Sequence, residues 1–283
     1  MTTVRIGMVN YINTAPIYEV WKSRAIPADW QVTEAPPSTL NRLLAEDRLD
    51  LGFVSSHEYA ARPEKYRILA DLSISATGPV GSVFLFSSLP PEELTGKQVL
   101  LTGQSQTSVA LVKIVLEEFI KVQPRYQTGE VFSGGQCARD VSAILAIGDE
   151  ALRLHAEGSH PYRLDLADVW QRTTGLPFVF AVFAVREDFV RQHPATLRQV
   201  WQTLIDCRNQ GRTRLAEISA AVAPRIPMEV AACHDYLRKI EHHLGAAHQK
   251  GLELFFTYLV RRGDGDSHAL PLKFFPCGAA RPE

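Results

Sequence analysis

The chain has 283 residues, of which 46% are hydrophobic and 22% charged, so it can bury a full core and has the length of about two domains. Thirty lysines and arginines face 31 acidic residues, and this net charge of −1 creates no overall field for nucleic acid or an anionic membrane. No apolar run reaches the ~18 to 20 residues of a membrane span. No export signal precedes Val4, and we expect a cytoplasmic protein.

The first part of the chain alternates between strand and helix patterns. We predict a strand over 5–9, a helix over 15–21, a strand over 30–34, a capped amphipathic helix opening at Ser38, and a strand over 49–54. This βαβαβ order predicts an α/β fold with a parallel sheet, whose ligands bind beyond the carboxyl ends of the strands. Ser55 and His57 follow the third strand, and we expect both to bind substrate.

The remaining elements predict a second lobe inserted into the first. Strand patterns cover 81–86, 97–101, 143–147 and 177–185, a helix runs to Ile120, 124–129 is polar, helices cover 187–223, 228–244 and 251–261, and 263–267 resembles a surface tail. The chain would cross between lobes twice, near 81–96 and along 177–185. We therefore expect lobe 1 over 1–87 and 186–283, lobe 2 over 88–185, and a ligand cleft between them.

A run of hydroxyl side chains marks a candidate anion site. Ser105, Thr107 and Ser108 follow the strand ending at Leu101 and open the next helix. Free backbone N–H groups and the helix dipole make such a helix start attractive to anions. The alternative is a simple helix cap, which needs only one hydroxyl.

Cysteine and histidine spacing argues against metal. Cys137, Cys207, Cys233 and Cys277 are far apart, and we predict neither disulfides nor structural zinc. The histidines at 242, 243 and 248 invite a metal interpretation, but 242 and 243 would point about 100° apart on a helix. A solvated helix face explains them better, and no Gly-x-Ser-x-Gly elbow supports a hydrolase triad.

Five ordered segments within about residues 4–186 resemble the chorismate dehydratase family of the futalosine route to menaquinone. They are Val-Asn-Tyr-Ile-Asn-Thr-Ala-Pro at 9–16, Gly-Pro-Val-Gly-Ser-Val at 78–83, Ser-Gln-Thr-Ser-Val at 105–109, Ile-Gly-Asp-Glu-Ala-Leu at 147–152 and the stretch from Trp170 to Val182. The resemblance implies a two-lobed fold like that of type 2 periplasmic binding proteins. It also implies an enzyme, without metal or organic cofactor, that removes water from chorismate to give 3-[(1-carboxyvinyl)oxy]benzoate.

The resemblance further indicates which residues act. We expect Asn13, Ser82 and Asp149 to be catalytic, and Tyr11 to bind substrate together with the hydroxyls at 105–108. Asn13 could donate its amide to the departing hydroxyl or to a carboxylate. The structural alternatives are an Asx turn for Asn13, a hydroxyl satisfied within the sheet for Ser82, and a helix cap for Asp149.

The base that removes the ring proton stays open. His57 titrates in the useful range, yet a carboxylate of the substrate itself, held beside the ring, could take the proton, and we favour it slightly. The sister enzyme of the same pathway, which makes 1,4-dihydroxy-6-naphthoate, and a non-catalytic binding protein for an aromatic carboxylate remain alternatives. We expect a small-molecule substrate and a monomer or homodimer.

Overall fold

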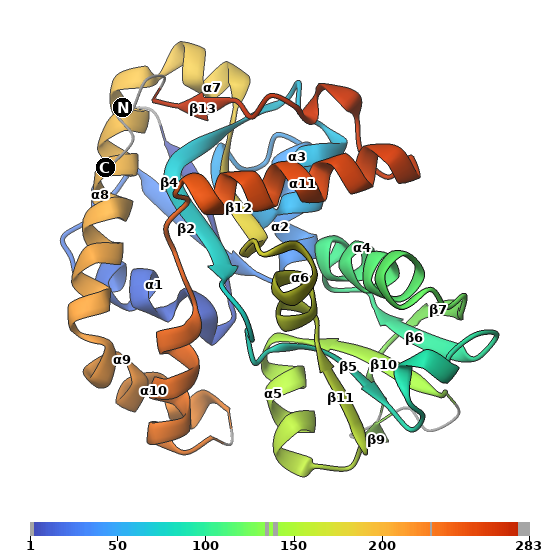
Figure 1. Cartoon of the computed structure of the whole chain (residues 1–283). Coiled ribbons are helices and arrows are strands. Elements are labelled where there is room, and N and C mark those ends of the chain that lie inside the picture. Colours follow the sequence, from blue (N-terminus) through green and yellow to red (C-terminus); the bar gives the residue numbers. More distant parts are fainter. Residues whose placement is uncertain (1–2, 134–135, 138–140, 227, 277–283) are drawn as a thin grey trace.

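The computed structural model describes residues 3–133, 136–137, 141–226 and 228–276. Two large sheets lie in different parts of the molecule (Figure 1). The first has the order β13-β4-β12-β3-β1-β2 and contains β1 (Val4–Val9), β2 (Trp30–Ala35), β3 (Leu51–Ser55), β4 (Tyr66–Ala76), β12 (Phe178–Arg186) and β13 (Phe274–Phe275). The second has the order β11-β5-β10-β6-β7 and contains β5 (Val83–Ser87), β6 (Gln98–Thr102), β7 (Arg125–Gly129), β10 (Ala143–Ile147) and β11 (Tyr162–Asp165). A small third sheet pairs β8 (Phe132–Ser133) with β9 (Gln136–Cys137).

The N-terminal βαβαβ unit is confirmed. β1 pairs in parallel with both β2 and β3, and the helices α1 (Ala15–Lys22) and α2 (Pro37–Ala45) connect them. The predicted cap at Ser38 is wrong, because α2 begins one residue earlier, at Pro37, and has no side-chain cap. Proline suits this first helical position, since its fixed φ matches the helix and its missing N–H needs no partner there.

Two strands differ from the sequence prediction. β4 was not predicted, and 124–129, expected to be only polar, forms β7 at the edge of the second sheet, parallel to β6. An edge strand can carry polar side chains on its exposed face, which hides it from a search for apolar runs. Both sheets are also mixed rather than wholly parallel. β12 is antiparallel to β3 and β4 in the first sheet, and β5 is antiparallel to β10 and β11 in the second.

The chain passes between the two sheets at 77–82 and at 175–177. β5 belongs to the second sheet and the whole of β12 to the first. The lobe boundary expected at 87/88 therefore lies after β5, one strand beyond the passage at 77–82. The boundary expected at 185/186 lies at the end of β12, one strand beyond the passage at 175–177. Both passages contain glycine at positive φ, at Gly78, Gly81 and Gly175, a conformation that other residues rarely adopt.

The α-helices that follow β12 are here called the C-terminal group. They are α7 (Glu187–Gln192), α8 (Pro194–Thr213), α9 (Leu215–Val222), α10 (Val230–Lys239) and α11 (Ala246–Arg262). The helix expected over 228–244 is too long. α10 ends at Lys239, and the segment 240–244 runs extended, with Glu241 bridging Ser75 of β4. The expected surface tail at 263–267 is followed by β13, which pairs with β4.

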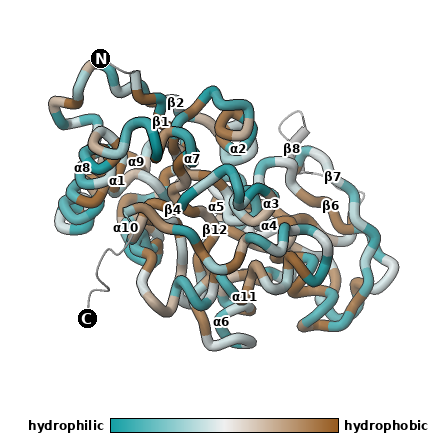
Figure 2. Tube along the Cα trace, turned by 90° about the horizontal axis from the view of Figure 1, so that it is seen from above, coloured by the Kyte–Doolittle hydropathy of each residue, from teal (hydrophilic) through white to brown (hydrophobic). Residues whose placement is uncertain are grey.

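The remaining helices are α3 (Ser56–Ala61), α4 (Gln106–Ile114), α5 (Gly148–Glu157) and α6 (Leu166–Thr174), and a π-helical turn over Val115–Ile120 continues α4. Short 3-10 turns cover Ile12–Thr14, Pro91–Glu93, Ala223–Arg225 and Ser267–Ala269. Figure 2 shows hydrophobic stretches in the interior of the molecule and hydrophilic stretches on peripheral helices such as α8. None of the helices in the described ranges is long and apolar enough to cross a membrane.

Two of the four cysteines are described with their side chains. Cys207 and Cys233 are buried and free. Cys277 lies outside the described residues, as does the side chain of Cys137.

Candidate functional site

A pocket that is partly open to solvent, here called the first pocket, lies between the two sheets. Its polar lining comes from both sides of the cleft and consists of Tyr11, Asn13, Ser55, Ser82, Ser105 and Ser108. Its apolar lining includes Ile74, Val80, Ile147, Phe180 and Ile240. None of the described residues that line it carries a charge. The first pocket therefore offers an apolar wall together with neutral hydrogen-bonding groups.

Asn13 lies in the short turn Ile12–Thr14 that follows β1. Its side-chain oxygen Oδ1 is buried and has no hydrogen-bond partner among the described residues. Its backbone carbonyl accepts a hydrogen bond from Nε2 of His242, at 2.7 Å. Because a buried amide oxygen without a partner is costly, a ligand hydroxyl or N–H at this point would be bound favourably.

Tyr11 reaches from the same loop to the other side of the cleft. Its hydroxyl donates to the side-chain oxygen of Gln104, which lies just before α4. Its ring packs on Gly148, where an added Cβ would come within 3.0 Å of the ring. Gly148 also has a φ of +56°, so this position favours glycine for two independent reasons.

The start of α4 supplies two of the predicted hydroxyls. Ser105 caps the helix by accepting from the backbone N–H of Ser108 at 3.2 Å, and its own hydroxyl donates to Oγ of Ser108 at 3.1 Å. The proton of Ser108 has no acceptor among the described residues and the side chain lines the first pocket. The cap and the anion site, treated as alternatives in the sequence, are compatible because different serines serve them.

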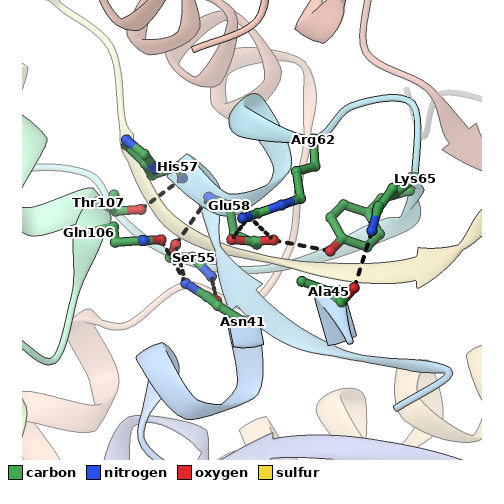
Figure 3. Close-up of polar contacts among 10 residues, drawn as sticks. Asn41, Ala45, Ser55, His57, Glu58, Arg62, Lys65, Gln106 and Thr107 are labelled. Atoms are coloured by element: carbon green, nitrogen blue, oxygen red, sulfur yellow. Dashed lines mark hydrogen bonds and ion pairs between the residues drawn. The ribbon is translucent and has the colours of Figure 1, made fainter. Parts of the chain in front are cut away.

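Asn41, which the sequence analysis missed, orients Ser55 (Figure 3). The Asn41 amide donates from Nδ2 to Oγ of Ser55 at 2.9 Å and accepts from the Ser55 backbone N–H at 3.0 Å. Oγ of Ser55 also accepts from the backbone N–H of Glu58, at 3.2 Å. With both acceptor positions of Oγ in use, the hydroxyl proton of Ser55 is free to donate into the first pocket.

The same amide links the two sides of the cleft. Nδ2 of Asn41 also donates to the side-chain oxygen of Gln106 in the first turn of α4, at 3.1 Å. Asn41 is buried within a helix face formed by Leu40, Leu43 and Leu44. A polar residue on the apolar face of an amphipathic helix was the signal in the sequence that could have identified it.

Thr107 and His57 lie together but do not line the first pocket. Oγ1 of Thr107 accepts from the backbone N–H of His57 at 2.9 Å, which ties α4 to α3 (Figure 3). His57 lines a second pocket, together with Lys113 and Asp264. Burial lowers the pKa of His57, and its Nδ1 has no partner among the described residues.

Glu58, which lies on α3, is buried and pairs with the partly exposed Arg62 (Figure 3). Arg62 donates to both of its carboxylate oxygens at 2.7 Å, and the hydroxyl of Tyr66 donates to one of them at 3.0 Å. Desolvation nevertheless raises the pKa of Glu58. These groups satisfy one another, and we assign them to the stability of lobe 1 rather than to ligand binding.

The passage at 77–82 carries Ser82 into the first pocket. The backbone N–H groups of Val80 and Gly81 donate to the carboxylate of Asp165, at 3.2 and 2.7 Å. The same carboxylate caps α6 by accepting from the backbone N–H groups of Ala167 and Asp168. Burial raises the pKa of Asp165, and these four N–H donors oppose the rise. The sequence analysis did not identify Asp165 as a functional residue. Its carboxylate connects the passage at 77–82 to α6, the helix that leads into the passage at 175–177.

Asp149 lies beside the first pocket rather than in its lining. α5 begins at Gly148 without a side-chain cap, so Asp149 is not the cap considered in the sequence analysis. Its Oδ1 is buried without a partner among the described residues, and desolvation raises its pKa. The charge of Arg153 and the backbone N–H of Ile12, in the loop that carries Asn13, oppose this rise.

The described residues contain no group of three or more His, Cys, Asp or Glu side chains arranged to hold a metal ion.

The solvated helix face expected at 242–243 is wrong for His242, which is buried in the extended segment 240–244. Glu241 accepts hydrogen bonds from Nε2 of His248 and from the hydroxyl of Thr77, at 2.7 and 3.0 Å.

The fold is that of two-lobed periplasmic binding proteins. The chain is similar to the alkanesulfonate-binding protein SsuA of Xanthomonas axonopodis pv. citri, with a TM-score of 0.67, 15% identity and 94% of each chain covered. A crystal structure of a protein from Archaeoglobus fulgidus gives a TM-score of 0.72 at 19% identity, covering 92% of this chain and 97% of that one. At these identities the likeness shows the fold alone.

The sequence defines the family more closely. A family model described as menaquinone biosynthesis matches residues 4–261. A chorismate dehydratase of Thermus thermophilus is 33% identical over 88% of this chain and 93% of its own length. A chorismate dehydratase of Campylobacter jejuni is 29% identical over 75% of this chain and 82% of its own length. The chain belongs to the menaquinone biosynthesis family.

Proposed function

We propose that this chain is an enzyme that removes water from chorismate to give 3-[(1-carboxyvinyl)oxy]benzoate. The observation that carries the proposal is the make-up of the first pocket, together with the family. An apolar wall that includes Phe180 can lie against the substrate ring, and neutral hydroxyl and amide groups surround it. Chorismate combines a ring with two carboxylates and a ring hydroxyl, which are the groups such a lining can bind.

The reaction needs one C–H bond and one C–O bond to break. The electrons of the C–H bond form a new ring double bond, the C–O electrons leave with the hydroxyl, and the departing oxygen gains a proton to become water. Negative charge develops towards the ring carboxylate, because the lost proton is vinylogous to it. Donors already directed at that carboxylate stabilise the transition state more than the ground state.

We assign the contact with the ring carboxylate to Ser108, at the start of α4, and to Ser55, at the end of β3. Ser108 and Ser55 have hydroxyl protons without acceptors among the described residues, and both line the first pocket. The dipole of α4 adds to their effect. Each charge-assisted hydrogen bond of this kind contributes about 1.5 to 3 kcal/mol.

We assign Asn13 and Ser82 to the reacting part of the ring. Oδ1 of Asn13 can accept from the ring hydroxyl and its NH₂ can donate to the departing oxygen. Asp149 has a raised pKa next to the loop of Asn13 and is our candidate for orienting that loop or supplying a proton.

For the base, we propose a carboxylate of the substrate. No titratable acid or histidine among the described residues lines the first pocket, and His57 lines the second one. A carboxylate fixed beside the ring has a high effective concentration. It would take the ring proton, and that proton can then leave with the hydroxyl as water.

The test is direct incubation of the purified protein with chorismate, followed by mass spectrometry and absorbance. Loss of one water with appearance of an aromatic enol ether is the expected result. Intact chorismate after long incubation would contradict the proposal and favour a binding protein. Adding a chelator should leave the rate unchanged, whereas restoration of a lost rate by a divalent cation would contradict the metal-free mechanism.

Two expectations remain predictions. The cytoplasmic location is testable by cell fractionation, and the choice between monomer and homodimer by light scattering.

A further inference from the structure

We propose that Tyr236 is a positioning residue that makes the hydroxyl of Ser82 a hydrogen-bond donor directed into the first pocket. The proposal rests on the function proposed above, in which Ser82 contacts the substrate. Tyr236 lies on α10, in the C-terminal group of helices, where the sequence offered no functional motif.

The contact between these residues has a defined direction. The phenol hydroxyl of Tyr236 donates to Oγ of Ser82 at 3.0 Å, and both side chains are buried. The ring of Tyr236 also packs near Gly81, the residue before Ser82. Burial raises the pKa of Tyr236, and although the hydrogen bond with Ser82 opposes the rise, the net pKa lies above the usual value and the phenol stays protonated.

This direction determines what Ser82 can do. A serine hydroxyl has one proton and two acceptor positions. Once Oγ accepts from Tyr236, its proton must find another acceptor, and the described residues provide none. Ser82 lines the first pocket, so a ligand oxygen there can accept that proton. Accepting a hydrogen bond also polarises a hydroxyl and strengthens it as a donor.

The backbone around Ser82 is held as well. Its carbonyl accepts from the backbone N–H of Gly148 at 2.8 Å, and Asp165 holds the two preceding N–H groups. The main chain is therefore fixed from the second lobe, whereas the hydroxyl is oriented by Tyr236 from the C-terminal helices. Removing the phenol oxygen should leave the backbone of Ser82 in place and free the direction of its hydroxyl proton.

The experiment is a double-mutant cycle measured on chorismate turnover with Tyr236→Phe and Ser82→Ala. For Tyr236→Phe we expect kcat to fall by about 3- to 10-fold, the size of one neutral hydrogen bond. KM should change less than kcat. In the Ser82→Ala background, Tyr236→Phe should have no further effect on kcat, because the hydroxyl that it orients is gone.

Tyr59→Phe is the matched control. Tyr59 is also buried, and its hydroxyl accepts from the backbone N–H of Lys273, away from the first pocket. Both variants should lower the melting temperature, but only Tyr236→Phe should lower kcat. Equal kcat for the two single variants, or an undiminished effect of Tyr236→Phe in the Ser82→Ala background, would overturn the proposal. Wild-type protein without turnover would instead overturn the proposed function, so the two failures are distinguishable.

Discussion

The first and second pockets share Ser105 but differ in the side chains that line them. Neutral hydroxyls and an amide line the first pocket, whereas the second contains His57, Lys113 and Asp264. No carboxylate, histidine or lysine among the described residues lines the first pocket, so these groups are not placed to contact a ring bound there. In the first pocket, selectivity for an anionic substrate would come from oriented donors and a helix dipole rather than from opposite charge.

Neutral donors have a chemical consequence. An arginine or lysine beside a substrate carboxylate would lower the basicity of that carboxylate. Hydroxyl donors can bind one carboxylate while the other, less strongly bound, remains able to accept a proton. The difference between the pockets thus supports a mechanism in which the substrate supplies its own base.

The largest effect is expected at Asn13. Asn13→Ala should reduce kcat/KM by about 10²- to 10³-fold, as for loss of one preorganised donor to developing negative charge. Turnover of chorismate measures the effect, and the melting temperature serves as the control for folding. Near-wild-type turnover would remove Asn13 from the proposed mechanism.

A smaller effect is expected at the hydroxyls of the first pocket. Ser108→Ala and Ser55→Ala should each weaken substrate binding by about 1 to 3 kcal/mol, or about 5- to 150-fold in Kd. Isothermal titration with a non-reacting aromatic dicarboxylate provides the measurement. Thr107→Val, which removes the acceptor for the His57 N–H, should have less effect on Kd. Equal losses at all three positions would mean that the hydroxyls act by holding the helix.

A pH effect is expected at His242, which lies behind the loop of Asn13. Burial lowers its pKa to about 4. At pH values between the unfolded pKa near 6.5 and the folded pKa, His242 carries a proton in the unfolded chain but not in the folded chain. The free energy of unfolding therefore falls as the pH falls through this range. At pH 5 the loss is at most about 2 kcal/mol. Urea unfolding of wild type and His242→Gln at pH 7 and pH 5 would show it as a weaker pH dependence in the variant.

The smallest effect is expected in the second pocket. His57→Gln and Lys113→Met should leave chorismate turnover unchanged, because neither side chain lines the first pocket. The pH-rate profiles of wild type and His57→Gln should accordingly be the same. If His57→Gln lost as much turnover as Asn13→Ala, the second pocket and not the first alone would take part in the reaction.

The sequence alone determined the elements whose signal is local. Apolar runs and helix caps depend on residues that are close together in the sequence. The βαβαβ start, the capping Ser105 and the two-lobed fold class could therefore all be predicted. The motifs also brought Asn13, Ser82 and Ser108 into one hypothesis before any geometry was known, and all three line the first pocket.

The tertiary structure alone decided which of these residues share a cavity and what orients them. Thr107 and Ser108 are neighbours in the chain, yet helical geometry directs one towards α3 and the other into the first pocket. Asn41, Asp165 and Tyr236 contact residues 14, 84 and 154 positions away, respectively. Such contacts depend on how distant segments pack, and no local pattern of residues encodes them.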